Sequence, residues 1–335
     1  MSASWMAFHI FYASDANPIV TECVKPFVDR TRSEGTLARW FFIKYWLEGP
    51  HLRVRLLPAE GVDAEALRRE FLTEVQAFLA RRPALYESDF DGADELYARM
   101  FVAEYGEDEY ARRYGEGKMP FRDNNSVWEF DYEPELERYG GPAGVALAEW
   151  HFEHSSDVVA MLLDQTNTHV RPTLLGLSMQ LTLMMAYAFL GSDEAVSRFF
   201  TRYRAFWETT YQEPSDDYHD NFEKSLQASE DALCERIERV KAALQADPGT
   251  LGYLERTWLA HCLELRGRVL ATAPEMDFGG RALPVDSPDD YEALAAVLLS
   301  SYIHMTNNRL GAAILDEIYL SYLIERVTSP QGVPS

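Results

Sequence analysis

The chain has 335 residues, of which 47% are hydrophobic, 13% aromatic and 25% charged, a composition typical of a globular protein and not of a disordered one. Lys and Arg number 31 against 54 Asp and Glu, giving a formal net charge of −23. Nucleic-acid binding needs a basic surface that displaces counterions, so we expect no nucleic acid among the partners. The simplest interpretation of this acidity is that the net charge keeps the protein soluble.

The cysteines Cys23, Cys234 and Cys262 are far apart and in no metal-binding spacing. A disulfide framework or zinc site is therefore not expected, and the protein is predicted to be cytoplasmic. Residues 1–6 lack the basic and apolar regions of a signal peptide. The longest apolar stretch, Leu174–Leu190, is interrupted by polar residues, so it predicts a buried core helix and no membrane span.

The chain opens with alternating strand and helix patterns. Trp5–Ala13 is rich in aromatic and branched residues and predicts a strand, which a helix over Pro18–Arg32 follows. Ala38–Leu47 and His51–Leu57 predict two more strands, and the turn signal Glu48-Gly49-Pro50 between them indicates an antiparallel hairpin.

A helical apolar stripe returns in Ala64–Arg82, and partial alternation in Ser126–Tyr132 predicts a fourth strand. The order strand, helix, hairpin, helix, strand is that of a ferredoxin-like antiparallel sheet. Residues 84–125 are then an insertion.

From about Gly144 onward the pattern is almost wholly helical. The expected helices are Val145–Leu163, Leu174–Leu190, Ser192–Tyr211, Asp220–Ala246, Leu251–Ala271 and Pro288–Val327. Gly191 followed by Ser192 reads as a helix end and a new N-cap, and Ser287 caps the last helix in the same way. The predicted fold class is α+β: a small antiparallel ferredoxin-like sheet near the N-terminus followed by a mostly α-helical region. Because the sequence contains no linker-like segment, we expect one interwoven domain over residues 1–335, with a sheet-containing part (1–142) and a helical part (143–330).

Three basic sites are candidates for binding or catalysis. In the second hairpin strand, the period of two places His51, Arg53 and Arg55 on one face. Two guanidinium groups on a rigid strand are suited to bind carboxylates. From physics alone, a solvated face paired with nearby acids is an equally good interpretation.

The second site is Arg138 with Tyr139, directly before the glycine pair at 140–141, and the third is the segment from His304 to Arg309. His304 and Asn308 are four residues apart and so share a helical face. By themselves, Arg138 is more typical of a surface residue and His304 of a core histidine. His304 is a candidate because two further polar residues, Asn308 and Arg309, follow it closely in the sequence.

Other chemistries find little support. His151, His154 and Asp157 have no second metal-ligand pair, so no metal site is expected. The residues around Gly115 and Gly117 do not form a phosphate-binding loop, and neither a dinucleotide motif nor a nucleophile elbow occurs, so no cofactor is expected.

Three ordered motifs resemble a known family. They are Trp40–Arg55 (WFFIKYWLEGPHLRVR), Tyr132–Gly141 (YEPELERYGG) and His304–Arg309 (HMTNNR). Together they are similar to the C-terminal, glutamate-eliminating domain of lantibiotic dehydratases, also called the thiopeptide-type bacteriocin biosynthesis domain. In such families, Ser or Thr of a ribosomally made precursor peptide is glutamylated from charged tRNA. Glutamate is then eliminated to leave dehydroalanine or dehydrobutyrine.

The resemblance implies a lyase that carries out the elimination half of this reaction as a stand-alone protein. It implies that Arg55 and Arg138 hold the carboxylates of the leaving glutamate and that Arg53 supports them. His304 would transfer a proton, as acid or as base. His51, Asn308, Arg309 and Tyr139 would line or position the site.

Two other functions stay open. A thiopeptide pyridine synthase shares this fold and joins two dehydroalanines by a formal aza-cycloaddition, and it needs no glutamate-binding cluster. A non-catalytic scaffold that binds precursor peptide would tolerate loss of the site residues. The expected partners are the precursor peptide and a separate glutamylating dehydratase subunit, with no membrane, and a homodimer is left open.

Overall fold

The computed structural model describes residues 4–86, 93–115, 117–211, 217–283 and 285–329. Two compact units make up the chain: unit 1 is residues 1–133 with 159–165, and unit 2 is residues 134–158 with 166–335. The expectation of one interwoven domain, with its parts meeting at residue 142, stays a prediction.

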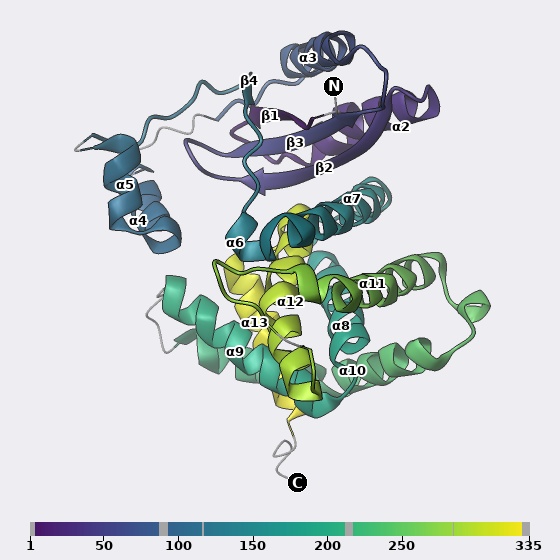
Figure 1. Ribbon diagram of the computed structural model, residues 1–335. Helices are drawn as coiled ribbons and strands as arrows, with labels where there is room; N and C mark the ends of the chain where they lie inside the picture. Colours follow the sequence, from purple (N-terminus) through teal and green to yellow (C-terminus); the bar gives the residue numbers. More distant parts are fainter. Residues whose placement is uncertain (1–3, 87–92, 116, 212–216, 284, 330–335) are drawn as a thin grey trace. The chain divides into compact units, whose positions relative to one another are not determined.

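Unit 1 contains a four-stranded antiparallel sheet with helices on one face (Figure 1). Its strands are β1 (Met6–Phe11), β2 (Leu37–Tyr45), β3 (His51–Pro58) and β4 (Ser126–Phe130). Its helical segments are α1 (Asn17–Ile19), the π-helical turn η1 (Val20–Val24), α2 (Lys25–Ser33) and α3 (Ala64–Arg81). The strand order β2-β3-β1-β4 is the ferredoxin-like order, so the predicted hairpin and sheet are confirmed.

The helix-covered face of the sheet is apolar. Leu52, Val54 and Leu56 of β3 are fully buried, and the Phe8 ring of β1 lies 4.7 Å from the Phe71 ring of α3. Each such side chain contributes roughly 1.5–3 kcal/mol when buried. This packing fixes the register of β3, so its intervening residues lie on the other face of the sheet.

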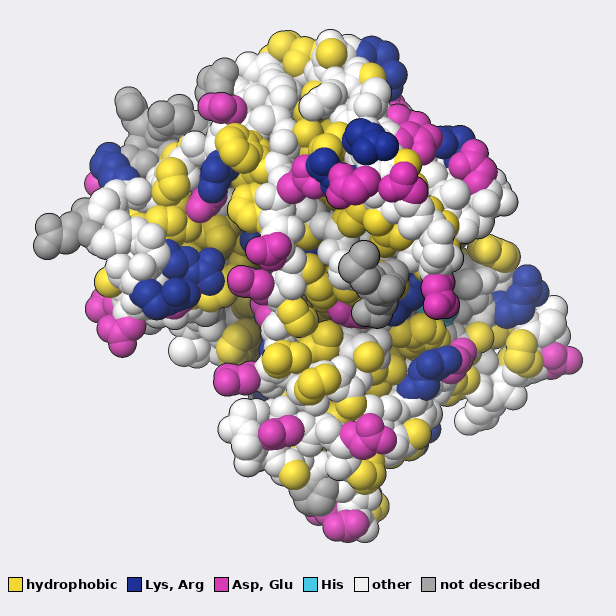
Figure 2. Space-filling view, turned by 45° about the horizontal axis from the view of Figure 1, so that its top comes forward, with side chains coloured by type: hydrophobic (Ala, Val, Ile, Leu, Met, Phe, Trp, Pro, Cys, Tyr) yellow, Lys and Arg dark blue, Asp and Glu magenta, His cyan; other side chains and the backbone are white. Residues whose placement is uncertain are grey.

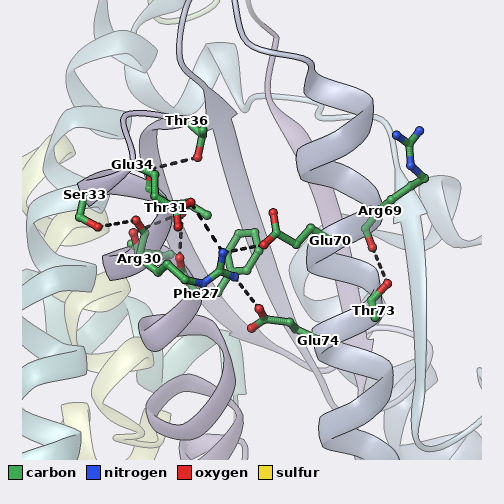
Figure 3. Close-up of polar contacts among 11 residues, drawn as sticks. Phe27, Arg30, Thr31, Ser33, Glu34, Thr36, Arg69, Glu70, Thr73 and Glu74 are labelled. Atoms are coloured by element: carbon green, nitrogen blue, oxygen red, sulfur yellow. Dashed lines mark hydrogen bonds and ion pairs between the residues drawn. The ribbon is translucent and has the colours of Figure 1, made fainter.

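Arg30 joins the two helices that cover this face (Figure 3). One guanidinium nitrogen lies 2.5 Å from Glu70 Oε1 and the other 2.5 Å from Glu74 Oε1, one helical turn further along α3. These groups are partly exposed, so each ion pair contributes at most about 1 kcal/mol. Their effect is mainly to fix how α2 lies against α3.

Two helices, α4 (Ala93–Tyr105) and α5 (Glu107–Tyr114), form the predicted insertion between α3 and β4. Phe101 of α4 is buried with Met119 and with Leu47, which follows β2. Tyrosine and tryptophan side chains pack around these three residues. The insertion is thus attached to the hairpin by an aromatic cluster of its own.

Unit 2 is helical. Its α-helices are α6 (Leu136–Tyr139), α7 (Gly141–Gln165, whose residues 159–165 belong to unit 1), α8 (Arg171–Leu190), α9 (Asp193–Tyr211), α10 (Asp217–Gln245), α11 (Tyr253–Thr272), α12 (Pro288–Leu310) and α13 (Ile314–Thr328), with 3₁₀ turns η2 (Pro248–Thr250) and η3 (Ala273–Glu275). The predicted caps are confirmed: Gly191 is left-handed, Ser192 Oγ accepts from the Ala195 amide, and Ser287 Oγ accepts from the Asp290 amide.

The prediction of one continuous helix over Pro288–Val327 was wrong. Gly311 adopts φ +102 and ends α12, and α13 begins at Ile314. The apolar pattern continues across this point, and a lone glycine inside a helical pattern is often tolerated. Here the glycine supplies a left-handed conformation that other residues rarely adopt.

The apolar helix α8 is long and hydrophobic enough to cross a membrane by composition alone. However, 67% of its most apolar window is buried within the protein, and α8 contacts α9, α10, α11, α12 and α13. It is a core helix of unit 2, as predicted.

Acidic side chains occur in several separate places on the face drawn in Figure 2, interspersed with Lys, Arg and apolar side chains. On this face the acidic side chains do not form one continuous patch.

Candidate active site

An arginine–histidine cluster lies on the face of the sheet opposite α2 and α3. We define it as His9 of β1 with His51, Arg53 and Arg55 of β3. The antiparallel register pairs His9 with Arg53, while Arg55 is opposite Ala7, whose small side chain leaves room beside it. The cluster is buried except for Arg53, which is half-buried.

Arg55 donates from Nη2 to His9 Nε2 at 3.1 Å and from Nη1 to the Val54 carbonyl at 3.2 Å. Its guanidinium also lies 5.6 Å from the centre of the Tyr132 ring. The Nε donor is buried and has no hydrogen-bond partner within the described part of the chain. One hydrogen-bonding group of Arg55 is thus unsatisfied within the described residues.

Arg53 is held by two contacts on its own side of the sheet. Its guanidinium stacks 3.5 Å from the centre of the Tyr45 ring, and its Nε donates to His51 Nε2 at 3.1 Å. His51 Nδ1 lies 2.8 Å from the Gly49 carbonyl, which can only accept. His51 therefore carries its proton on Nδ1 and accepts with Nε2, as a neutral ring does.

No carboxylate among the described residues pairs with Arg53 or Arg55. Burial, followed by the charge of Arg53, lowers the pKa of Arg55 to about 9. Burial and the Arg53 charge lower the pKa of His51 to about 3, and burial with both arginines lowers that of His9. At neutral pH the arginines are charged and the histidines are not. The cluster therefore favours binding of an anion.

A second group of polar residues surrounds His304 of α12 in unit 2. His304 Nδ1 lies 2.8 Å from Glu317 Oε1 of α13, and the Glu317 side chain is fully buried. Since a carboxylate accepts, the Nδ1 atom is the one that carries a proton in this contact, and Nε2 is the other ring nitrogen. The His304 side chain is 18% exposed, and the Trp207 ring packs 4.8 Å from it.

Two further side chains donate to the Glu317 carboxylate, and a third orients one of them. Tyr203 donates to Oε2, and Asn307 Nδ2 donates to the same oxygen at 3.3 Å. Ser178 of α8 in turn donates to Asn307 Oδ1 at 2.6 Å. Burial and the Glu317 charge raise the pKa of Tyr203 well above its ordinary value, so it stays protonated and keeps donating. We call His304, Glu317, Tyr203, Asn307 and Ser178 the His304 network.

Arg138 of α6 reaches the helix that carries His304. Its Nε donates to Ser301 Oγ at 3.0 Å, and its Nη1 lies 3.3 Å from Glu135. Ser301 is three residues before His304, on the same helical face. Arg138 is also close enough for its charge to act on Tyr203 of the His304 network, whose pKa burial and Glu317 nevertheless raise well above its ordinary value. Unit 2 therefore brings Arg138 and the His304 network together.

The glycine pair after Tyr139 turns the chain into α7. Gly140 has φ +83, and a Cβ there would lie 2.9 Å from the Phe278 ring, so both the backbone and the space require glycine. Tyr139 itself is buried, edge-on to Phe152 and stacked with Tyr302. Tyr139 also shares a hydrogen bond with Ser301, the residue to which Arg138 donates, so it both packs in the core and joins the polar contacts around Arg138.

Asn308 is half-buried on α12, while Arg309 is fully buried. Arg309 donates to Ser156 Oγ at 3.1 Å and to the Met305 carbonyl at 2.8 Å, and it lies over the Phe152 ring. These contacts fix α12 against α7. The predicted substrate-positioning roles of Asn308 and Arg309 stay predictions.

The predicted site residues thus form two groups that belong to different units. His51, Arg53 and Arg55 lie together in unit 1, and Arg138, Tyr139 and the residues of α12 lie in unit 2.

Five residues of these groups were not among the predicted site residues: His9, Glu317, Tyr203, Asn307 and Ser178. His9 was missed because its partners are over forty residues away, although its position in a strand next to the arginine strand was a usable signal. Glu317 and Tyr203 were missed because the break at Gly311 was not predicted.

The two histidines considered for a metal site, His151 and His154, each stack on a third histidine, His261. His151 Nδ1 lies 2.9 Å from His261 Nε2, and His154 Nδ1 donates to the Trp150 carbonyl at 2.9 Å. Burial lowers the pKa of His151 well below its ordinary value and that of His261 to about 3. Within the described ranges, no three His, Cys, Asp or Glu residues are arranged to hold a metal ion.

Three solved structures resemble this chain to different degrees. The pyridine synthase TbtD from thiomuracin biosynthesis is 20% identical, with a TM-score of 0.74 over 96% of this chain and 97% of TbtD. TsrL is 15% identical, with a TM-score of 0.63 over 97% and 94% of the two chains. MibB, a tRNA-dependent lantibiotic dehydratase from Microbispora sp. 107891, is 20% identical, with a TM-score of 0.49 over 96% of this chain and 27% of MibB.

At these identities the likeness to TbtD and TsrL shows a shared fold. No curated protein matches the sequence. The family model for the C-terminal part of lantibiotic biosynthesis dehydratases matches residues 5–328, which include all three motifs. The chain therefore belongs to the lantibiotic biosynthesis dehydratase C-terminal family.

Proposed function

We propose that this protein eliminates glutamate from glutamylated Ser or Thr residues of a ribosomally made precursor peptide, leaving dehydroalanine or dehydrobutyrine. The observation that carries the proposal is the state of Arg55. It is a buried cation without a carboxylate partner among the described residues, and one of its donors is unused. Burying such a charge is costly unless a bound anion compensates it. A leaving glutamate is such an anion.

In the proposed reaction, Arg55 and Arg138 bind the carboxylates of glutamate, and Arg53 adds positive charge beside Arg55. The ester oxygen becomes a carboxylate as the Cβ–O bond breaks, so fixed positive charge stabilises the transition state more than the ground state. The arginines thereby contribute to turnover as well as to binding.

His304 acts as the base. Its Nε2 takes the Cα proton, the electron pair forms the Cα–Cβ double bond, and glutamate departs with the electrons of the Cβ–O bond. A carboxylic acid has a pKa of roughly 3.5, so the departing glutamate needs no proton at neutral pH. Glu317 holds the Nδ1 proton and stabilises the imidazolium until it releases its proton to water.

The partners in this proposal are the precursor peptide and a separate dehydratase subunit that performs the tRNA-dependent glutamylation, in the cytoplasm. The acidity of this chain supports the assignment of glutamylation to a separate subunit, because a net charge of −23 is unfavourable for binding tRNA.

A second candidate function is the joining of two dehydroalanines to form a pyridine. It is favoured by the likeness to TbtD, which extends over nearly the full length of both chains. Likeness of fold alone is a weak guide to activity. Cycloaddition releases no glutamate, so it gives the unneutralised arginines no function, and we therefore rank it second.

Mass spectrometry of two peptides distinguishes these functions. One peptide carries glutamyl esters on Ser or Thr, and the other is already dehydrated and bears azoles. The wild-type protein is expected to convert the first to the dehydrated peptide and to leave the second unchanged. Conversion of the second to a macrocycle, with glutamyl esters left intact, would establish the pyridine synthase activity instead. No change in either peptide, with the peptides bound, would establish a scaffold.

A further inference from the structure

Two neutral hydrogen-bond acceptors occur where a protein would ordinarily place carboxylates. In the arginine–histidine cluster, His9 Nε2 accepts from Arg55 and His51 Nε2 accepts from Arg53. Elsewhere in unit 1, Arg30 pairs with Glu70 and Glu74, Arg68 with Glu65 and Glu129, and Arg122 with Glu48. The two arginines of the cluster are thus distinguished by histidine partners.

We propose that His9 and His51 are positioning residues that orient Arg55 and Arg53 while leaving the positive charge of both arginines available to the substrate. This proposal rests on the proposed function, because it assumes that the cluster binds the carboxylates of a glutamyl group. It adds His9, which lies on a different strand from the arginine motif. It also explains why a histidine, and not a carboxylate, stands beside each arginine.

The geometry supports an orienting role. The His9 ring is stacked between the His51 ring at 4.9 Å and the Phe130 ring at 4.1 Å, so it has little freedom to rotate. The His51 ring is fixed by its hydrogen bond to the Gly49 carbonyl. Each histidine therefore presents Nε2 from a fixed position, and each arginine is aligned by one hydrogen bond.

The electrostatics explain why histidine serves here. A carboxylate at either position would orient the guanidinium equally well, but it would form an ion pair and compete with the substrate carboxylate. A neutral imidazole gives the hydrogen bond without the competing charge. Burial lowers the pKa of both rings most, and the positive charge of Arg53 and Arg55, with that of Arg122 for His9, lowers it further, so both histidines stay neutral.

A matched pair of variants tests this charge argument. Gln and Glu have the same shape, and each can present an oxygen close to the place of His9 Nε2. His9→Gln keeps a neutral acceptor for Arg55, while His9→Glu adds a negative charge at the same point. The probe is a precursor peptide whose glutamyl group is joined through an amide to diaminopropionate, which cannot be eliminated. The same peptide without glutamate measures binding by the rest of the peptide.

Isothermal titration calorimetry should show that His9→Gln binds the amide probe within about threefold of wild type. His9→Glu should weaken the binding about 10- to 100-fold, the range expected when one charge-assisted contact is lost. Binding of the glutamate-free peptide should be equal for all three proteins. The His9→Glu variant should melt no lower than His9→Gln, because it gains an ion pair, so misfolding cannot explain its weaker binding. His51→Gln and His51→Glu should differ in the same sense, by less, since Arg53 is half-buried.

Equal affinities of His9→Gln and His9→Glu for the amide probe would overturn the inference, whether both variants bind as tightly as wild type or both bind weakly. In both cases wild type would still bind the probe and eliminate glutamate from the ester, so the proposed function would stand. A wild-type protein that does not distinguish the amide probe from the glutamate-free peptide would instead refute the proposed function, and this inference with it.

Discussion

The arginine–histidine cluster of unit 1 and the His304 network of unit 2 use the same residue types in opposite ways. In the cluster, arginines are the charged groups and histidines are their neutral acceptors. In the network, a histidine is paired with a buried carboxylate whose other oxygen accepts from two more donors. Within the described ranges, the cluster keeps a positive charge without a carboxylate partner, which suits binding of an anion. The network holds a proton in place, which suits proton transfer.

The largest expected effect is that of removing the base. His304→Ala should lower the rate of glutamate elimination by about 10²- to 10⁴-fold, because general base catalysis contributes in this range. The affinity for the amide probe should stay near that of wild type. Quench-flow mass spectrometry of the glutamyl ester measures the rate, and an unchanged rate would remove His304 from the mechanism.

Removing the charge of Arg55 should act on binding. Arg55→Met keeps much of the side-chain volume, and it should weaken binding of the amide probe by about 10- to 100-fold. Its melting temperature should be equal to or above that of wild type, because a buried charge without a counter-ion is removed. If the variant instead unfolds at a much lower temperature, Arg55 is a structural residue.

Neutralising the carboxylate of the network should have a smaller effect than removing the histidine. Glu317→Gln keeps the shape and an acceptor for His304 Nδ1, but it loses the charge that stabilises the imidazolium. We expect turnover to fall about 10- to 100-fold with little change in probe affinity. Asn307→Asp is a useful companion, because it places a second negative charge next to Glu317. A Glu317→Gln variant with wild-type turnover would show that the pairing is only structural.

The smallest effect concerns acid stability. The pKa of His51 is about 3 in the folded protein, against an ordinary value of 6.5. Between these values the unfolded chain binds more protons, so the contribution of His51 to stability is complete above about pH 6.5 and is lost as the pH falls toward 3. His51→Gln should reduce the slope of unfolding free energy against pH by up to about 1.4 kcal/mol per pH unit. Urea unfolding at pH 4.5 and 6.0 checks this, and an unchanged slope would contradict a neutral, buried His51.

The sheet and its cationic face could be predicted because both follow from local periodicity. Alternation in β3 places His51, Arg53 and Arg55 on one face whatever the rest of the fold does. The partner of Arg55 could not be predicted in this way. His9 reaches it through the register of β1 against β3, which depends on the packing of the whole sheet.

The partners within the His304 network were even harder to predict from local sequence periodicity. In one continuous helix, His304 and Glu317 would be thirteen residues apart and about 20 Å distant along the axis. The end of α12 at Gly311 lets α13 turn back, and the two side chains lie 2.8 Å apart. The sequence motif therefore contained the histidine, while its carboxylate partner depended on a single glycine.

The division of roles between the two regions is tested most directly by binding of the non-eliminable amide probe to two inactive variants. We predict that His304→Ala binds the glutamyl probe as tightly as wild type, although it does not eliminate glutamate from the ester. We predict that Arg55→Ala binds the glutamyl probe about 10- to 100-fold more weakly than wild type, while it binds the glutamate-free peptide equally well. Wild-type affinity of Arg55→Ala for the glutamyl probe would contradict the account, because the cluster would then not be the anion-binding site.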